Sequence, residues 1–178
     1  MTITPTEIPG VLVIEPRVFT DDRGSFFESF NAQAFAAAIG YEVAFVQDNQ
    51  STSRQHVLRG LHYQEPKPQG KLVRAVAGVI FDVAADIRPE SPTFGRWVGV
   101  ELSAANRRQL WVPAGLAHGF LVLSELAEVL YKTTEFYAPG CEKVIRWDDP
   151  TLAIMWPLPA APVLSARDAA APWLADRF

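Results

Sequence analysis

Residues 79–88 read VIFDVAADIR, a stretch in which apolar and polar side chains nearly alternate. In an extended chain the polar residues Asp82, Asp86 and Arg88 would share one face. The apolar residues of the opposite face are Phe81, Val83, Ala85 and Ile87. A period of two is typical of a strand with one face buried and the other in water. The stretch therefore predicts a half-buried β-strand.

Neighbouring segments repeat this pattern between short turn sequences. Val98, Val100 and Leu102 alternate with less apolar neighbours, and further strands are expected at 110–112, 120–123 and 129–137. Proline and glycine punctuate the intervals at 88–92, 113–115 and 138–140. Many short strands with such breaks predict an all-β antiparallel sandwich or jelly roll. A chain of 178 residues is expected to form a single domain over 1–178.

Only short helices are expected. Asn31 is suited to cap the start of a helix over 32–39, and Gly40 is suited to end it in the left-handed conformation. Ser165 and Asp168 have the spacing of a capping box, which predicts a second short helix. A capping role alone would explain a carboxylate at position 168.

The composition argues against several kinds of partner. A formal net charge of −4 gives no reason to expect a nucleic acid, which requires a basic surface. No apolar run approaches the ~20 residues needed to cross a bilayer, and the first residues do not resemble a signal peptide. The single cysteine, Cys141, cannot form an internal disulfide, which favours a reducing compartment. We expect a soluble cytoplasmic protein without nucleic-acid or membrane partners.

The chain contains three histidines, His56, His62 and His118. A metal-binding jelly roll usually needs two or three histidines that converge with a carboxylate. Neither H-x-H nor H-E-x-x-H occurs here. The three could still meet in space, because 56 and 62 have the same parity in a regular strand. We expect neither a catalytic metal nor another cofactor.

The segment Leu58–Gln64, LRGLHYQ, brings a basic side chain close in sequence to a histidine. Such a pair could serve a substrate that carries both an acidic C–H bond and phosphates. In a regular strand Arg59 and His62 would point to opposite faces, but Gly60 could introduce a bulge that re-aims one of them. The alternative is a core histidine that is hydrogen-bonded to the backbone.

Two further strands carry candidate polar groups. Lys71 follows Gln69 and Gly70 at the start of one strand, and Tyr131 lies between Val129 and Thr133 in another. The small and apolar neighbours would suit a phenol that faces an interior cavity. The alternative is a packing tyrosine with its hydroxyl at the surface. From the residues alone, we infer a β-sandwich with a possible His/Tyr/Lys pocket.

Nine blocks of sequence, in order, resemble the dTDP-4-dehydrorhamnose 3,5-epimerase family over nearly the whole chain. They are DRGSFFESF (22–30), QDNQS (47–51), LRGLH (58–62), QGKLVR (69–74), DIR (86–88), SPTFG (91–95), PAGLAHGF (113–120), AEVLYK (127–132) and LSARD (164–168). The order and spacing of the set are far more specific than any one block. The resemblance implies a cupin jelly roll, usually a homodimer. It also implies inversion of C3 and C5 of dTDP-4-dehydro-6-deoxy-D-glucose on the route to dTDP-L-rhamnose.

This resemblance implies a role for each of four side chains. His62 would be the base that removes a proton next to the C4 ketone, and Asp168 would hold its imidazole in the correct tautomer. Tyr131 would be the acid, and Lys71 would donate to the developing oxyanion. A phenol with a pKa of about 10 suits a donor better than a base, which agrees with this assignment.

The resemblance also implies a set of substrate-binding residues. Their positions are Arg23, Phe26, Glu28, Gln47, Asp48, Asn49, Arg59, Lys71, His118, Glu142 and Arg167. Arg23 and Arg59 would neutralise the diphosphate, and Phe26, with Tyr137 as a companion, would stack on thymine.

Three positions depart from the family pattern: Leu116, Phe136 and Lys143. Because none of them removes a catalytic group, an enzyme remains the leading interpretation. The alternatives are an epimerase that acts at C3 or C5 only and a 3,4-ketoisomerase of the same substrate class. An alternative of another class is a non-catalytic cupin that binds a nucleotide sugar.

Overall fold

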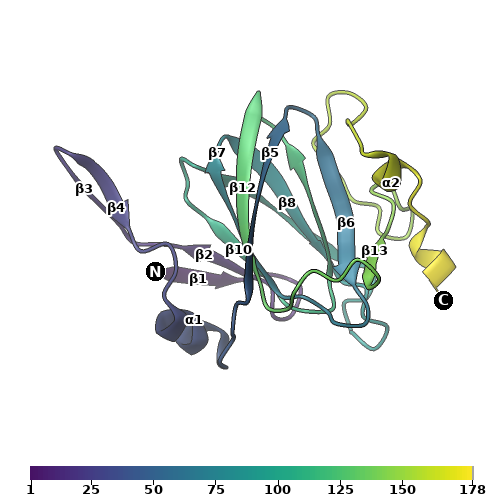
Figure 1. Ribbon diagram of the computed structural model, residues 1–178, viewed down its shortest axis with the longest axis horizontal. Coiled ribbons are helices and arrows are strands. Elements are labelled where there is room, and N and C mark those ends of the chain that lie inside the picture. Colours follow the sequence, from purple (N-terminus) through teal and green to yellow (C-terminus); the bar gives the residue numbers. More distant parts are fainter. Residues whose placement is uncertain (178) are drawn as a thin grey trace.

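Two antiparallel β-sheets face each other in the computed structural model, which describes residues 1–177 (Figure 1). The larger sheet has the order β1 (Thr2–Pro5), β2 (Leu12–Glu15), β10 (Gln109–Val112), β7 (Lys71–Ala77), β12 (Leu126–Thr133) and β5 (Gln47–Arg54). The smaller sheet has the order β13 (Glu142–Val144), β6 (Leu58–Gln64), β11 (Ala117–Val122), β8 (Val79–Ala85) and β9 (Trp97–Ser103). The predicted all-β jelly-roll class is confirmed.

The main hydrophobic core lies between these sheets. Val73 and Ala75 of β7 belong to the same buried cluster as Ile80 and Ala84 of β8. The other buried members are Ile8, Val11, Leu102, Leu110, Val112, Leu116, Phe120, Val122, Ala127 and Val129. Tyr131 of β12 packs against this cluster with a side chain that carries a hydroxyl. The core therefore continues into a region where polar groups face inward.

Residues 79–85 form a strand, shorter than the predicted 79–88, and the prediction of one exposed face was wrong. Asp82 and Val83 alternate in direction along β8, and both are wholly buried. The outward face of β8 joins a second apolar cluster whose members include Val83, Ile145, Leu152, Ile154 and Leu174. The C-terminal part of the chain thus covers this sheet from outside, which a local pattern of residues does not reveal.

The strand predicted at 129–137 ends earlier, at Thr133. The Thr133 hydroxyl donates a 2.9 Å hydrogen bond to the carbonyl of Glu135, and the chain leaves the sheet there. Phe136 and Tyr137 consequently lie in an exposed loop.

The helices begin where the capping residues predicted. Asn31 caps α1 (Ala32–Ile39) by accepting a 3.0 Å hydrogen bond from the Ala34 N–H, and Gly40 ends it with φ of 84°. Ser165 similarly caps α2 (Ala166–Ala169), which precedes a 3-10 helix η1 (Leu174–Arg177). No helix within residues 1–177 is long and apolar enough to cross a membrane.

A separate hairpin of β3 (Val18–Asp21) and β4 (Gly24–Phe27) projects from the sandwich (Figure 1). Its aromatic residues Phe19 and Phe26 are 51% and 71% exposed. In Figure 1 the hairpin lies at the opposite end of the molecule from β6, β13 and α2.

Candidate active site

A cavity of about 230 Å³ lies between the two sheets, among side chains from both. It is lined by Ser51, Arg59, His62, Lys71, His118, Phe120, Tyr131 and Glu142. The smaller sheet presents two histidines to this cavity, whereas the larger sheet presents a lysine and a tyrosine. A molecule bound there would therefore meet different chemical groups on its two faces.

An irregularity in β6 places Arg59 and His62 on the same cavity. His62 pairs with His118 of β11, but Arg59 pairs with Phe120, so β6 contains one extra residue over this interval. Gly60 lies within it with φ of 124°, and a Cβ atom there would come 2.6 Å from the Cα of Gly119. The predicted bulge is confirmed, and it depends on a close approach of two backbones that only glycine permits.

His62 and Asp168 form a hydrogen-bonded pair at the cavity wall. Nε2 of His62 lies 2.7 Å from Oδ1 of Asp168, a carboxylate that is only 3% exposed. Burial by itself raises the pKa of Asp168, but hydrogen bonds from His62, Ser165 and the Gly60 N–H outweigh it and hold that pKa below its usual range. An ionised carboxylate only accepts hydrogen bonds, so Nε2 carries a proton and Nδ1 of the neutral ring is left as the acceptor.

Asp168 also lies in the first turn of α2, where the Ser165 hydroxyl accepts a 3.1 Å hydrogen bond from its N–H. Ser165 thus caps the helix as predicted, while the Asp168 carboxylate points to His62. The capping role that could explain this aspartate belongs to its backbone, and its side chain is free to orient the histidine.

Tyr131 and Lys71 enter the cavity from the larger sheet. Burial raises the pKa of Tyr131, and the negative charge of Glu142 raises it further against the opposing effect of Arg59. Lys71 is 8% exposed, and its ammonium donates a 3.3 Å hydrogen bond to the His62 carbonyl. Burial lowers the pKa of Lys71 to about 8, although the carboxylates of Glu142 and Asp82 oppose this shift. Because its pKa is raised, Tyr131 is a protonated donor at neutral pH.

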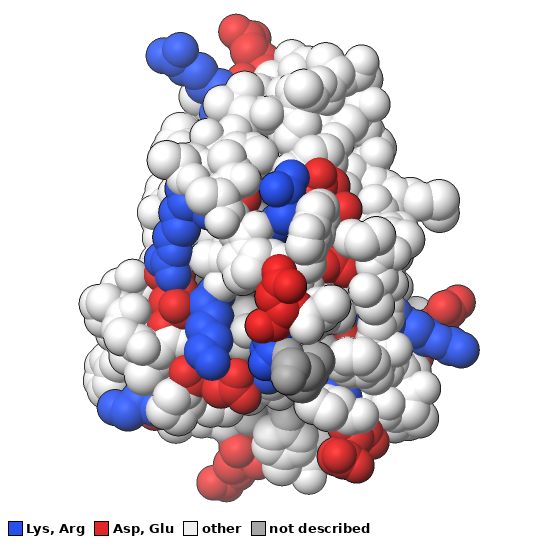
Figure 2. All heavy atoms as spheres, turned by 90° about the vertical axis from the view of Figure 1, so that its right-hand side faces the viewer, with Lys and Arg blue, Asp and Glu red and all other residues white. Residues whose placement is uncertain are grey.

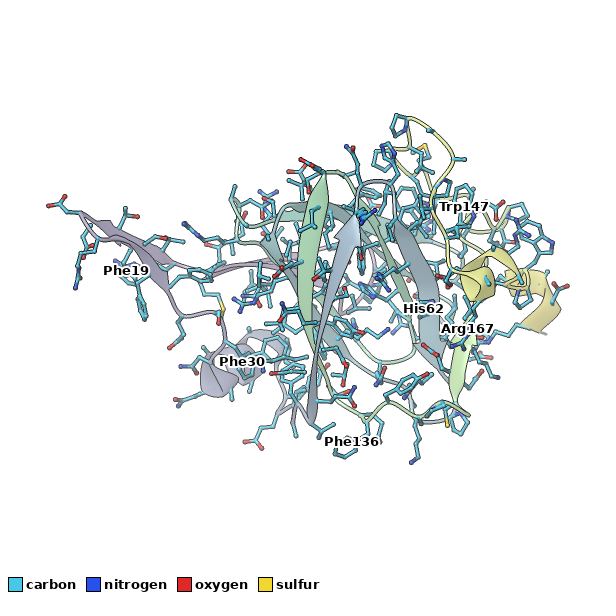
Figure 3. The ribbon with its side chains drawn as sticks, turned by 45° about the horizontal axis from the view of Figure 1, so that its top comes forward. Phe19, Phe30, His62, Phe136, Trp147 and Arg167 are labelled. Carbon is cyan, nitrogen blue, oxygen red and sulfur yellow. The ribbon has the colours of Figure 1, made fainter. Side chains whose placement is uncertain are left out.

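Polar groups at the cavity mouth bind one another. Glu142 accepts a 3.0 Å hydrogen bond from the Tyr137 hydroxyl and forms an ion pair with Arg167, whose Nη2 also donates 3.0 Å to the Glu142 carbonyl. Figure 3 shows Arg167 at the same end of the molecule as His62. On the face that carries β6, β13 and α2, acidic and basic side chains intermingle (Figure 2). Such a surface differs from the basic surface that a nucleic acid requires.

The predicted residues on β5 divide between the two sides of the sheet. Gln47 and Asn49 bind each other at 2.8 Å, and Gln47 accepts a hydrogen bond from the Tyr137 N–H. Asp48, between them, lies on the other side and pairs with Lys132 at 2.9 Å. The period of two in a strand is the reason that this run of three polar residues cannot face one cavity together.

In a single copy of the folded chain, three predicted binding residues lie far from the cavity. Arg23 and Phe26 belong to the projecting hairpin, and Glu28 follows it directly. Figure 3 shows Phe19 of the same hairpin at the far left of the molecule, well away from His62, which lies within the sandwich. Arg23 is almost fully exposed and pairs with Asp21 at 2.5 Å. A single copy of the chain does not bring these residues to the cavity.

Three residues of the site were missed by the sequence reasoning. Ser51 and Phe120 line the cavity, and both stand in blocks that match the family, yet neither side chain signals chemistry on its own. Asp82 lies 2.9 Å from His118 Nε2. The alternation in its strand placed Asp82 on a solvent-facing side, so nothing local indicated a buried partner for a histidine.

The three histidines do not converge. His62 and His118 are paired residues on neighbouring strands, but His56 occupies the turn before β6, with φ of 63°. Among residues 1–177, no group of three or more histidine, cysteine, aspartate or glutamate side chains is arranged to hold a metal ion.

Comparison with known proteins identifies the family of this chain. Residues 5–176 match the model of the dTDP-4-dehydrorhamnose 3,5-epimerase family. The proteins of that name from Pseudomonas aeruginosa and Salmonella typhimurium are 62% and 59% identical, over 94% and 98% of this chain and 93% and 96% of theirs. The crystal structure of dTDP-6-deoxy-D-glucose-3,5-epimerase from Legionella pneumophila, in complex with dTDP-4-keto-L-rhamnose, has a TM-score of 0.95 and 52% identity, and the match covers 98% of this chain and 93% of that one. The chain therefore belongs to the dTDP-4-dehydrorhamnose 3,5-epimerase family of isomerases.

Proposed function

We propose that this chain converts dTDP-4-dehydro-6-deoxy-D-glucose to dTDP-4-dehydro-L-rhamnose by inverting C3 and C5. The observation that carries the proposal is the placement of His62, paired with Asp168, and Tyr131 on opposite walls of one cavity. An inversion requires a base on one side of a sugar ring and an acid on the other. The high identity to named 3,5-epimerases supports this function over action at a single carbon.

The reaction begins with a proton next to the C4 ketone, which is acidic because its loss gives an enolate. Nδ1 of His62 takes this proton, and the Asp168 carboxylate stabilises the imidazolium that forms. Lys71 donates to the enolate oxygen from a buried position, where a fixed charge acts more strongly than in water. Tyr131 then gives a proton to the opposite face of the same carbon, and the configuration is inverted.

The proposal includes a homodimer, because the residues expected to bind the nucleotide do not all lie at one cavity. Arg59 is held by a 2.9 Å hydrogen bond to Ser53 and can neutralise a diphosphate at the cavity. Arg23 and Phe26 would reach the nucleotide only if the hairpin of a second copy extended over the cavity. We also propose a cytoplasmic location. The sole cysteine, Cys141, is unpaired, as is usual for proteins of a reducing compartment.

Incubating the purified protein with dTDP-4-dehydro-6-deoxy-D-glucose and identifying the product by NMR tests the proposal. We expect a 4-keto sugar with both neighbouring carbons inverted. His62→Ala should lower kcat by about 10²–10⁴-fold, the usual contribution of a positioned base. A product whose ketone has moved to C3 would indicate a ketoisomerase instead. Tight binding of dTDP-sugar without any turnover would indicate a binding protein.

A further inference from the structure

A second histidine–aspartate pair lies beside the first and is not used by the mechanism above. His118 is the direct cross-strand neighbour of His62, and its Nε2 lies 2.9 Å from Oδ1 of Asp82. The side chain of Asp82 is wholly buried, and that of His118 is 8% exposed. His118 lines the cavity, whereas Asp82 lies behind it on β8.

The other carboxylate oxygen of Asp82 is unusual. Within residues 1–177, only two buried side-chain oxygen or nitrogen atoms lack a hydrogen-bond partner, Oδ2 of Asp82 and Oγ of Ser51. Ser51 lines the same cavity. A buried polar atom without a partner costs about 1–3 kcal/mol, and more when the group is charged. An unsatisfied buried carboxylate oxygen directly behind a histidine that lines the cavity calls for a functional explanation.

The charge of Asp82 acts on Lys71 as well as on His118. The Lys71 ammonium contacts the His62 carbonyl of β6. Ionisable and polar groups from several strands line the same cavity: Arg59 of β6, His118 of β11, Tyr131 of β12 and Glu142 of β13. Asp82 of β8 lies behind His118. Asp82 and Glu142 are the two carboxylates that raise the pKa of Lys71 against the effect of burial. Removing either carboxylate should therefore make Lys71 lose its proton at lower pH.

We propose that Asp82 is a positioning residue of this epimerase site, which orients His118 and keeps the Lys71 side chain a cation beside the enolate oxygen. An ionised Asp82 carboxylate can only accept hydrogen bonds. Nε2 of His118 therefore carries a proton whether the imidazole ring is neutral or positively charged. Asp82 thereby fixes which edge of the imidazole faces the substrate. Lys71 and His118 then act together on the oxygen where charge develops. This inference rests on the proposed function for its chemistry, but not for its geometry.

The geometry is tested without turnover by ¹⁵N NMR of the imidazole rings in the ligand-free protein. The chain has only three histidines, so His56→Gln and His62→Gln variants suffice to assign His118. We expect neutral His118 to carry its proton on Nε2 in the wild type. A ring protonated on Nδ1, or a mixture of both tautomers, would overturn the proposal even if no Asp82 variant could be purified.

The effect on catalysis is tested by the pH dependence of kcat/KM in Asp82→Asn, which keeps the shape and an acceptor oxygen but removes the charge. We expect kcat to fall by about tenfold or more while KM changes less, because the lost interaction acts on the developing enolate. The decline of activity at high pH should move to lower pH by about one unit, as expected when a nearby opposite charge is removed. Asp82→Ser, which also lacks the charge, serves if the asparagine variant does not fold.

Asp86→Asn is the matched control, because Asp86 is a wholly buried aspartate just beyond the same strand and outside the cavity. It should lower stability but leave the high-pH limb of kcat/KM in place. An unchanged high-pH limb in Asp82→Asn, in an enzyme whose wild type turns over, would overturn the positioning role. Absence of turnover in the wild type would instead count against the proposed function, and the NMR result would still decide the geometry of His118.

Discussion

The chemistry of His62 depends on which ring nitrogen carries a proton. A hydrogen bond to one neighbouring residue, Asp168, determines this tautomer. Asp168 accepts a hydrogen bond from Nε2–H of His62, with an N···O distance of 2.7 Å, and lies at the start of α2, far from His62 in the sequence. The family resemblance implied that Asp168 would hold the His62 imidazole, whereas the residues alone left a capping role for Asp168 open, and the folded chain shows the two side chains in contact. The same contact stabilises the imidazolium after proton transfer.

At this scale we expect Asp168→Asn to lower kcat by about 10²–10⁴-fold while the fold persists. An asparagine amide can donate to Nε2 and so favour the tautomer in which Nδ1 carries the proton and cannot act as the base. Steady-state kinetics and circular dichroism provide the measurements. Asp148→Asn, which removes a surface aspartate paired with Arg146, is the control and should change kcat less than twofold. A decrease of less than tenfold in Asp168→Asn would contradict the role of the pair.

At the scale of the element, the irregular strand β6 determines which side chains share the cavity. Gly60 tolerates its φ of 124° and leaves room for the Gly119 backbone. A sequence can indicate such a bulge when a glycine separates two candidate residues of opposite parity. It cannot indicate the partner strand, whose own glycine makes the close approach possible.

We expect Gly60→Ala to destabilise the protein by about 1–3 kcal/mol, the usual cost of a residue held in an unfavourable conformation. It should also lower kcat/KM, because relief of the 2.6 Å contact with Gly119 would shift Arg59 or His62. Urea unfolding and kinetics measure both effects. Gly140→Ala is the control, since a Cβ atom there meets nothing within 4 Å. Equal stability of the two variants would contradict this account of the bulge.

The loop after β8 is held by Asp86, whose carboxylate accepts from Arg88, Ser91 and Thr93 at 2.6–2.9 Å. Burial raises the pKa of Asp86, but these hydrogen bonds outweigh it and hold the pKa well below its usual range. Because the pKa is depressed in the folded state, the stabilisation is complete above the ordinary value of about 4 and is lost as the pH falls below it.

We expect Asp86→Asn to lower the free energy of unfolding by about 3 kcal/mol at pH 7, as when one partner of a buried ion pair is removed. At pH 3 the gap between wild type and variant should narrow by about 1 kcal/mol, because the unfolded wild type then takes up a proton that the folded state does not. Urea unfolding at the two pH values measures the gap. If the difference in free energy of unfolding between wild type and Asp86→Asn were larger at pH 3 than at pH 7, this role of the Asp86 carboxylate would be contradicted.

Elements defined by local signals were predicted well, and those defined by distant contacts were not. Asn31 and Gly40 mark both ends of α1 because capping involves only neighbouring backbone groups. The face of residues 79–88 that was predicted to be exposed, with Asp82, instead turns into the sandwich beside Ile80 and Ala84. The C-terminal segment covers the opposite face through Ile145 and Leu174. The positions of Asp82 and of the hairpin likewise depend on the complete fold.

At the scale of the whole molecule, the projecting hairpin is the feature that one copy of the chain leaves unexplained. It carries Arg23 and the largely exposed Phe26, and Figure 3 shows its Phe19 well away from His62. Closed pairs with two-fold symmetry are the commonest soluble oligomers, and such a pair would let each hairpin reach the other cavity. In the proposed homodimer, each hairpin would therefore help to form the partner's substrate-binding site.

Co-expression of His62→Ala and Arg23→Ala chains tests this arrangement. Each variant alone should have low kcat/KM. If each hairpin serves the partner's cavity, random pairing gives mixed dimers with one intact site, and about a quarter of wild-type activity should return. Activity equal to the average of the two single variants would show that the hairpin does not complete a neighbouring site.

His62 and Tyr131 are proposed to invert two carbons of one substrate through proton removal and return. The most direct measurement is to incubate the enzyme with dTDP-4-dehydro-6-deoxy-D-glucose in D₂O and to locate deuterium in the product by mass spectrometry and NMR. We expect one deuteron at C3 and one at C5, because both protons are returned from groups that exchange with solvent. Deuterium at only one carbon would limit the enzyme to a single site, and a product without deuterium would contradict the mechanism.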